Sequence, residues 1–366
     1  MKQGWEIKKL GEVFTLKAGK SISSDNIKPD GGEKMYPCFG GNGIRGYVDT
    51  YIAEGAYPII GRVGALCGNI QLSQGKFYAT EHAIVAYIKS NDIKAEWAAL
   101  ALKSLNLRQY AKGVAQPVIS AGQLSELSIA VPPIEVQERI VEELDCLSGI
   151  IEKKREQLKE LDALAESIFY TMFGDPITNE KGWEVKTIKE VAPQQEYKGD
   201  VPCINGKYWL LNLDMVSPQT GEVIEQCMFE YEEIGNSTIK FSSDNVLYSK
   251  LRPYLNKVVV PNEIGYATSE LVPLCPKKDV LHRVFFASLL RSSHFVKYIS
   301  GKVAGAKMPR VAMSEFREFA VMLPPLTLQQ KFADKIEAIE KQKELIKQSI
   351  TETEELFNSR MDYYFN

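Results

Sequence analysis

The sequence predicts an α+β fold with two tandem α/β domains, separated by two long helices that form an antiparallel coiled coil, in a pseudo-twofold internal repeat. Three observations lead to this prediction. The 366-residue sequence contains two copies of one pattern. Each copy begins with short β-type runs between glycines and ends with a long heptad pattern. A chain of this length can bury more than one hydrophobic core.

The internal repeat is the strongest of these features. Residues 4–13 (GWEIKKLGEV) return as residues 182–191 (GWEVKTIKEV), an offset of 178. A Pro-Pro pair at 132–133 returns at 324–325, where the offset has grown to 192. Loops tolerate changes of length that cores do not, so loop insertions in the second copy account for the drift. The chain is therefore predicted to hold two copies of one unit of about 180 residues.

The first part of each copy is predicted to be an α/β domain. Residues 56–60 and 83–88 in the first copy, and 257–260 in the second, are β-type runs bounded by turn residues. Helices are expected to interrupt the strands at 95–110 and 280–300.

Each Pro-Pro pair is followed by a predicted long helix, because proline is tolerated at a helix start. Apolar residues recur at spacings of four and three over roughly five heptads, which is typical of a coiled-coil seam. Ordinary core helices are the alternative, but they seldom hold a strict 3.5-residue period this long. A lysine interrupts each seam, Lys154 in one helix and Lys343 in the other. The predicted seam consists of Ile140, Leu144, Leu147, Ile151, Leu158, Leu161, Ile168, Phe332, Ile336, Ile339, Ile346, Ile350 and Phe357.

A domain precedes each helix, so the repeat favours an antiparallel pair with the domains at opposite ends. About 35 helical residues give a spacer of roughly 50 Å, equivalent to about 15 base pairs. The predicted boundaries are 1–133 for the first domain, 134–173 for its helix, 174–181 for a linker, 182–325 for the second domain and 326–366 for its helix.

Overall charge argues against a basic nucleic-acid-binding protein, because the net charge is −3 and the isoelectric point is near 5.9. The distribution is more informative than the sum. Residues 250–310 hold 11 basic and three acidic side chains, a local excess of +8 that can hold phosphates. The alternative is a solvated surface balanced by the acidic run at 214–233.

The sequence also indicates a soluble cytoplasmic protein without a metal site. We find neither an apolar signal segment at the N-terminus nor a stretch that could span a bilayer, so no membrane association is expected. The six cysteines are scattered without zinc-ligand spacing, which predicts reduced structural thiols.

Several motifs together resemble type I restriction-modification specificity subunits. They are Gly-Trp-Glu near each domain start, residues 36–47, the pair at 132–133 followed by Gln137, and residues 167–176. The resemblance implies two target recognition domains, each reading one half of a bipartite site in double-stranded DNA. It implies helices that set the spacing and dock two methyltransferase subunits, with a restriction/translocase subunit joining the complex. S-adenosylmethionine, ATP and the catalytic residues would belong to these partners, so the chain itself is expected to be non-catalytic and without a cofactor.

Residue chemistry supplies candidates for DNA contact. Basic side chains grip phosphates or guanine edges, and amides suit adenine. Arg62 and Arg252 stand at matching places 190 residues apart, and a structural arginine bonded to strand ends is the alternative for both. A plain turn residue is the alternative for Asn42. The candidates are Lys20, Asn42, Arg45, Arg62, Gln116, Lys250, Arg252, Asn256, Lys302, Lys307 and Arg310.

Enzyme classes find little support in the sequence. A DNA methyltransferase would need Asn or Asp before its Pro-Pro pair and an aromatic residue after it, and neither pair here has them. Phe14 stands where a phosphate-binding loop ending at Lys20 and Ser21 requires glycine. His82 beside Glu81 is interpreted as a structural pair. A non-catalytic coiled-coil scaffold or a free regulatory DNA-binding protein remains the second hypothesis.

Overall fold

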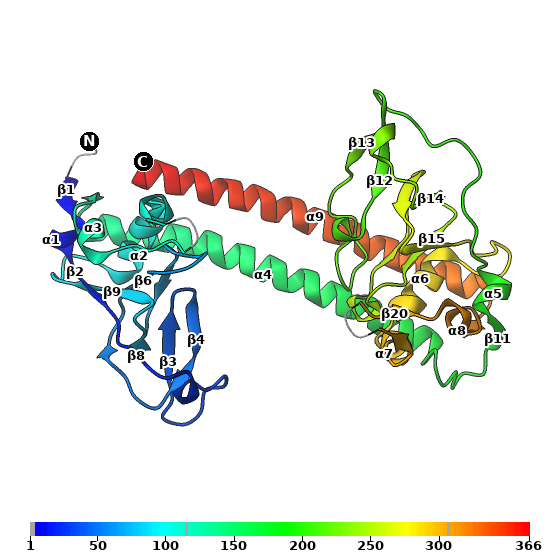
Figure 1. Ribbon diagram of the computed structural model, residues 1–366, viewed down its shortest axis with the longest axis horizontal. Coiled ribbons are helices and arrows are strands. Elements are labelled where there is room, and N and C mark those ends of the chain that lie inside the picture. Colours follow the sequence, from blue (N-terminus) through cyan, green and yellow to red (C-terminus); the bar gives the residue numbers. More distant parts are fainter. Residues whose placement is uncertain (1–3, 114–115, 306–307) are drawn as a thin grey trace. The chain divides into compact units, whose positions relative to one another are not determined.

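The computed structural model describes residues 4–113, 116–305 and 308–366. The chain divides into two compact units, one of residues 1–153 with 349–366 and one of residues 154–348, here called unit 1 and unit 2. Each unit contains one copy of the repeated domain together with part of each long helix (Figure 1).

Unit 1 is built from small sheets with short helices beside them. One sheet has the order β2-β9-β6-β7 and a second has the order β4-β3-β8-β5, while β1 pairs with β10. The strands are β1 (Glu6–Lys9), β2 (Phe14–Ala18), β3 (Tyr36–Gly40), β4 (Gly43–Val48), β5 (Ala53–Glu54), β6 (Pro58–Gly61), β7 (Ile70–Leu72), β8 (Lys76–Ala79), β9 (Ala83–Ile88) and β10 (Ser128–Val131). The helices of this domain are α1 (Leu10–Val13), η1 (Ser24–Asn26), α2 (Ala95–Ser104), η2 (Leu107–Tyr110) and α3 (Ala121–Ser125).

Unit 2 repeats this plan. Its sheets have the orders β13-β12-β17-β14 and β16-β15-β18, with the pairs β11-β21 and β19-β20. The strands are β11 (Glu184–Thr187), β12 (Lys207–Leu211), β13 (Met228–Glu230), β14 (Thr238–Phe241), β15 (Val246–Ser249), β16 (Val258–Val259), β17 (Gly265–Thr268), β18 (Leu271–Leu274), β19 (Val303–Ala304), β20 (Arg310–Val311) and β21 (Ala320–Leu323). The helices are α5 (Ile188–Val191), η3 (Leu213–Met215), η4 (Tyr231–Glu233), η5 (Pro253–Leu255), α6 (Arg283–Arg291), α7 (Ser293–Ser300) and α8 (Met313–Arg317).

Strand register confirms the tandem repeat. Glu6 lies opposite Val131 in the β1-β10 pair, and the equivalent residues Glu184 and Leu323 lie opposite each other in β11-β21. The β3-β8 pairing is parallel in unit 1, and so is the β12-β17 pairing in unit 2. The duplicated sequence therefore folds twice into the same α/β framework.

The two long helices are α4 (Ile134–Phe173) and α9 (Leu326–Phe365), each beginning directly after its Pro-Pro pair. In unit 1 the start of α4 meets the end of α9, where Arg360 binds Glu143. In unit 2 the end of α4 meets the start of α9, where the rings of Phe173 and Phe332 lie 5.2 Å apart. The helix segments are thus antiparallel within each unit. Every predicted seam side chain is buried or half-buried.

Each of the two repeated domains is joined to the long helix that follows it by a buried glutamine. Gln137, in the first turn of α4, is completely buried. Its Oε1 accepts a hydrogen bond from the Lys94 amide at 2.9 Å, and its Nε2 donates to the carbonyls of Asp92 and Pro132 at 2.8 and 2.9 Å. The side chain therefore ties the loop before α2 to the start of α4.

The same joint exists in unit 2. Gln329 is also completely buried; its Oε1 accepts from the His282 amide at 2.8 Å, and its Nε2 donates to the carbonyls of Val280 and Pro324 at 3.0 and 2.8 Å. The partners are main-chain groups in both units. This contact, here called the glutamine joint, explains why the repeat keeps Pro-Pro and glutamine at fixed spacing.

Candidate nucleic-acid interface

Three loops meet at one edge of the domain in unit 1. They are the loop after β6, the turn between β8 and β9, and the segment leading into α3. The Arg62 amide donates to the His82 carbonyl at 2.8 Å, and the Ile119 amide donates to the Arg62 carbonyl at 2.9 Å. Arg62 is thus the residue that ties the three loops together.

Lys250 holds the same position in unit 2. Its amide donates to the Glu270 carbonyl at 3.1 Å, and its carbonyl accepts from the Val311 amide at 2.9 Å. The structural counterpart of Arg62 is therefore Lys250, and the match of Arg62 with Arg252 was wrong. A basic residue occupies the three-loop junction of both units.

Close backbone approach builds the junction in unit 1. A Cβ on Gly61 would lie 2.2 Å from the carbonyl oxygen of Gly41, and a Cβ on Gly41 would lie 2.8 Å from that of Val63. Only glycine allows the ends of β3 and β6 to come this near. The loop that follows β3 is consequently held against the loop that follows β6.

An open pocket of about 520 Å³ lies at this junction, and Asn42, Arg45 and Gln116 line it together with His82. Three sequence candidates from two segments, the β3-β4 hairpin and the segment before α3, are therefore brought together. Arg45 donates to the Ser24 hydroxyl at 2.9 Å. The guanidinium of Arg62 donates a hydrogen bond to the Glu81 carbonyl at 3.2 Å. A bond of this kind is expected if Arg62 has a structural role, which is the alternative to DNA contact for this residue.

Lys20 follows β2 in the chain and lies beside the end of β8, outside that pocket. Its amide donates to the Ala79 carbonyl at 2.9 Å, and its side chain is exposed. It shares the β8-β9 end of the domain with the junction and remains a candidate for phosphate contact.

In unit 2 the junction gathers Lys250, Arg252 and Arg310. The Arg252 amide donates to the Pro309 carbonyl at 2.8 Å, and its exposed side chain extends from a left-handed backbone with φ 50°. Arg310 forms a two-pronged ion pair with Glu270, with a shortest N–O distance of 2.8 Å. Hydrogen bonds from Arg310 are the main cause that lowers the pKa of Glu270, so this carboxylate stays charged and offsets one cation.

Lys302 stands at the base of the β19-β20 hairpin, which leads to this junction. Its ammonium lies 3.3 Å from the Glu315 carboxylate and 4.8 Å from the centre of the Tyr298 ring. The exposed pair leaves Lys302 free to exchange its partner for a phosphate. Lys307 lies outside the described residues.

The prediction for Asn256 is wrong. Its side chain is only 8% exposed, and its Nδ2 donates to the Arg291 carbonyl at 2.9 Å. Its left-handed φ of 51° fits a residue that closes the turn after η5. Asn256 points into the domain and cannot reach a base edge.

Two junction residues were not among the candidates. His82 lines the pocket of unit 1 with its side chain 47% exposed, 3.6 Å from Glu81. Met308 is 48% exposed and lies 192 residues after Gln116. The two copies of the repeat are offset by the same 192 residues at the Pro-Pro pairs, so Met308 is the counterpart of Gln116 in unit 2. The repeat itself was the signal that could have identified Met308.

The part of the chain that the structure describes has no helix long and apolar enough to cross a membrane. Among the same residues we find no group of three His, Cys, Asp or Glu side chains placed to hold a metal ion.

Comparison with known proteins gives a consistent result. The model of the type I restriction modification DNA specificity domain matches residues 2–162 and 180–355. The type I restriction enzyme EcoprrI specificity subunit of Escherichia coli is 49% identical over 148 residues, which cover 39% of this chain and 37% of that protein. A putative type I specificity subunit of Mycoplasma pneumoniae, S.MpnORF507P, is 24% identical over 89% of this chain and 86% of its own length.

Solved structures share the fold. The S subunit of a type I restriction-modification system from M. genitalium superposes with a TM-score of 0.62 at 17% identity, covering 99% of this chain and 96% of that one. A chain from a study of complex assembly and conformational transition of the type I R-M system gives 0.58 at 16% identity, covering 98% and 97%. The family model spans both copies of the repeat and most of both long helices. This chain belongs to the type I restriction modification DNA specificity domain family.

Proposed function

We propose that the chain is the sequence-specific DNA-recognition subunit of a type I restriction-modification complex, with each domain reading one half of a bipartite site. The observation that carries this proposal is that one framework presents different side chains in the two units. Arg62 and Gln116 in unit 1 correspond to Lys250 and Met308 in unit 2. Base edges are distinguished by donors, acceptors and apolar contacts, so these differences suit two different half-sites.

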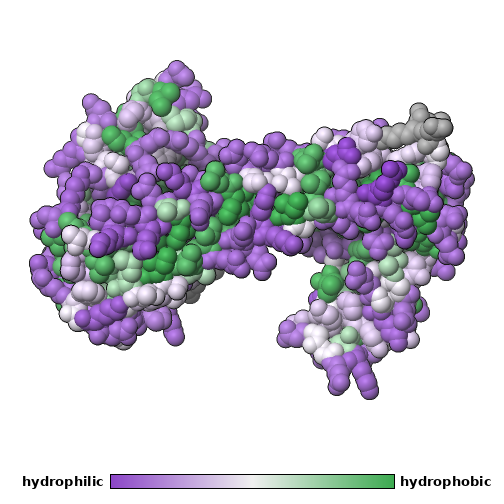
Figure 2. Space-filling view, turned by 180° about the vertical axis from the view of Figure 1, so that it is seen from behind, coloured by the Kyte–Doolittle hydropathy of each residue, from purple (hydrophilic) through white to green (hydrophobic). Residues whose placement is uncertain are grey.

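In this proposal residues 1–133 and 182–325 are the target recognition domains, and residues 174–181 link the first helix to the second domain. The helices at 134–173 and 326–366 set the half-site spacing and dock two methyltransferase subunits, and a restriction/translocase subunit joins them. Exposed apolar side chains on the helices support a docking role (Figure 2). They are Ile150, Leu164, Leu345 and Leu356. Catalysis, S-adenosylmethionine and ATP belong to the partners, and the complex acts in the cytoplasm.

A scaffold that binds only protein is the second candidate. It gives no reason for basic residues to meet at equivalent junctions in both domains, where Arg62 and Lys250 lie. A free regulatory DNA-binding protein would share that junction but would not direct methylation.

Methylation mapping separates these candidates. The chain would be co-expressed with a type I methyltransferase subunit, and methylated adenines would be mapped across the host genome. We expect one two-part motif with a fixed gap, which disappears when the gene for this chain is deleted. Methylation without a split motif would favour the scaffold, and binding without methylation would favour the free regulator.

We expect the double variant Lys250→Gln, Arg252→Gln to bind target DNA more weakly and with less salt dependence. Each phosphate contact contributes about 0.9 to the slope of log K against log salt concentration, so the slope should fall by up to about 2. Binding of the assembled methyltransferase complex would be measured at several salt concentrations. Lys278→Gln removes an exposed lysine, paired with Asp244, that lies outside the junction, and it serves as the control. Equal slopes for all three proteins would exclude phosphate contact by Lys250 and Arg252.

A further inference from the structure

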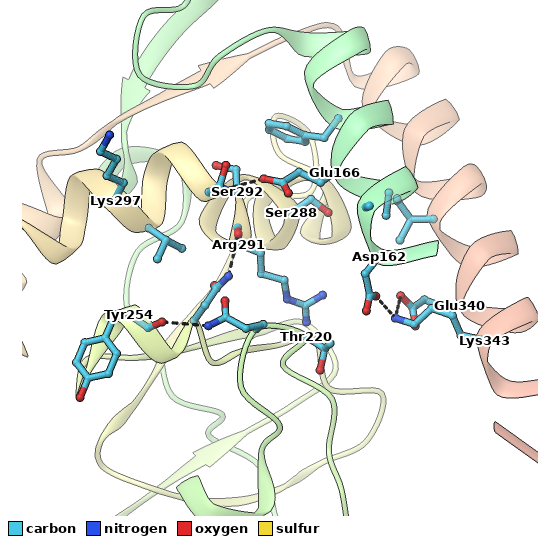
Figure 3. Close-up of a pocket in the computed structure, with 18 of the residues that line it drawn as sticks. Asp162, Glu166, Thr220, Tyr254, Ser288, Arg291, Ser292, Lys297, Glu340 and Lys343 are labelled. Carbon is cyan, nitrogen blue, oxygen red and sulfur yellow. Dashed lines mark hydrogen bonds and ion pairs between the residues drawn. The ribbon is translucent and has the colours of Figure 1, made fainter. Parts of the chain in front are cut away.

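A pocket of about 660 Å³ lies within unit 2, between the domain and the helix segments (Figure 3). Its walls come from the end of α4, from η5, from α6 and α7, and from α9. Pockets that hold small molecules commonly have volumes of this size. This pocket is separate from the three-loop junction of unit 2, because none of the junction residues lines the pocket.

Three carboxylates line the pocket, and each already has a partner. Lys343 is almost fully buried and binds Asp162 at 2.7 Å and Glu340 at 3.1 Å. Glu166 accepts a hydrogen bond from the Ser293 amide at the start of α7, at 2.9 Å. Asp162 and Glu340 therefore share one cation within the wall, and Glu166 is held by a main-chain amide.

Two lining cations have no carboxylate partner among the described residues, Arg291 and Lys297. In Arg291, Nε and Nη2 both donate to the Val258 carbonyl, at 3.0 and 2.5 Å. Burial lowers the pKa of Arg291 to about 10, and the nearby charges of Glu340 and Asp162 oppose this shift, so the guanidinium remains charged at neutral pH. Figure 3 shows its guanidinium pointing into the cavity toward Thr220.

The wall also carries buried oxygen atoms without hydrogen-bond partners. They are Oδ1 of Asn256, whose side chain is more than nine-tenths buried, and Oγ of Ser300. Orphaned buried polar atoms are costly, and a bound molecule that donates to them would remove the cost. Apolar walls from Phe169, Val296 and Ile336 complete the lining.

The twin unit carries a larger side chain at the equivalent helix position. Ala165 lines the pocket in unit 2, and the residue 192 positions later in the helix repeat is Phe357. Phe357 packs against the hydrophobic core of unit 1. The repeat therefore carries a large ring in one copy and a small side chain beside the cavity in the other.

We propose that this pocket binds a small organic anion, whose carboxylate or phosphate group pairs with Arg291 and Lys297 while a donor group reaches Asn256 and Ser300. The apolar part of the ligand would lie against Phe169 and Ile336. A bound molecule would bridge α4, η5, α6, α7 and α9, and so stiffen the attachment of this domain to its helices. This site is independent of DNA reading and does not rest on the proposed function.

Titration of the full chain with para-hydroxybenzoate and with phenyl phosphate tests the site and separates the two anion types. We expect saturable binding of at least one of them, and binding at least about tenfold weaker to Ala165→Phe, which copies the twin unit and fills the space. Leu164→Phe, on the exposed face of the same helix, is the control and should bind as the wild type does. The unfolding temperature of each variant would be compared with that of the wild type.

Lys297→Glu gives an independent reading, because its side chain is exposed and its replacement does not disturb the core. It should weaken binding of either anion. Neutral para-hydroxybenzamide should bind more weakly than the benzoate. The proposal is overturned if neither anion binds, if the neutral amide binds equally well, or if both Ala165→Phe and Lys297→Glu bind like the wild type.

Discussion

Replacing residues 182–325 with the corresponding domain of another family member is expected to change one half of the methylated motif completely and to leave the other half unchanged. The physical reason is that each unit has a hydrophobic core of its own, which includes Trp97 in unit 1 and Phe285 in unit 2. The replaced junction would carry different side chains at positions equivalent to Lys250 and Met308. Genome-wide mapping of methylated adenines measures the outcome directly.

The reciprocal exchange of residues 1–133 is the matched control, and it should alter only the other half-site. A donor domain with the same Pro-Pro and glutamine spacing should be chosen, so that the glutamine joint is retained. If either exchange changed both halves of the motif, the domains would not read DNA independently.

Gln329→Ala is expected to destabilise the protein by about 3 kcal/mol, because it leaves buried main-chain groups of His282, Val280 and Pro324 without partners. Denaturant unfolding, followed by tryptophan fluorescence, would measure the change. Gln330→Ala, at the exposed neighbouring position, should cost less than about 0.5 kcal/mol. Similar midpoints for the two variants would show that the glutamine joint contributes little.

Much of the fold could be predicted because the relevant signals are local. The Pro-Pro pairs and heptads predicted helices at 134–173 and 326–366, where α4 and α9 lie. The run at 56–60 overlaps β6, and the run at 83–88 coincides with β9. The predicted helix at 95–110 is interrupted, since Asn106 adopts a left-handed φ of 43° between α2 and η2.

The second interruption has the same kind of cause. The predicted helix at 280–300 is divided into α6 and α7 at Ser292, whose ψ of 140° is not helical and whose hydroxyl accepts a hydrogen bond from the Phe295 amide. A serine that caps a helix and a serine inside one look alike in a sequence.

The candidate site was less predictable, because it depends on burial and on contacts distant in the sequence. Asn256 looked like an exposed amide, and only the fold places it against Arg291. Arg62 was paired with Arg252 because both residues are arginines. The offset of 188 between the two Tyr-Ala-Thr tripeptides, at 78–80 and 266–268, already pointed to Lys250 instead. Residues in the two copies of a repeat should therefore be paired by the offset of the shared segment that lies nearest to them.

The two lysines of the seam also differ in a way that the pattern could not reveal. Lys343 is buried and bound to Asp162 and Glu340, whereas Lys154 is only half-buried.

Among the described residues, the side chains of Gln137 and Gln329 form hydrogen bonds with peptide groups of the domains that they anchor. Peptide groups are common to all sequences, so the glutamine joint itself makes no demand on the side chains of a domain. A gene segment encoding one domain can consequently be exchanged by recombination for a divergent homologue that still forms this joint, which gives the host a route to new DNA targets in a single genetic event.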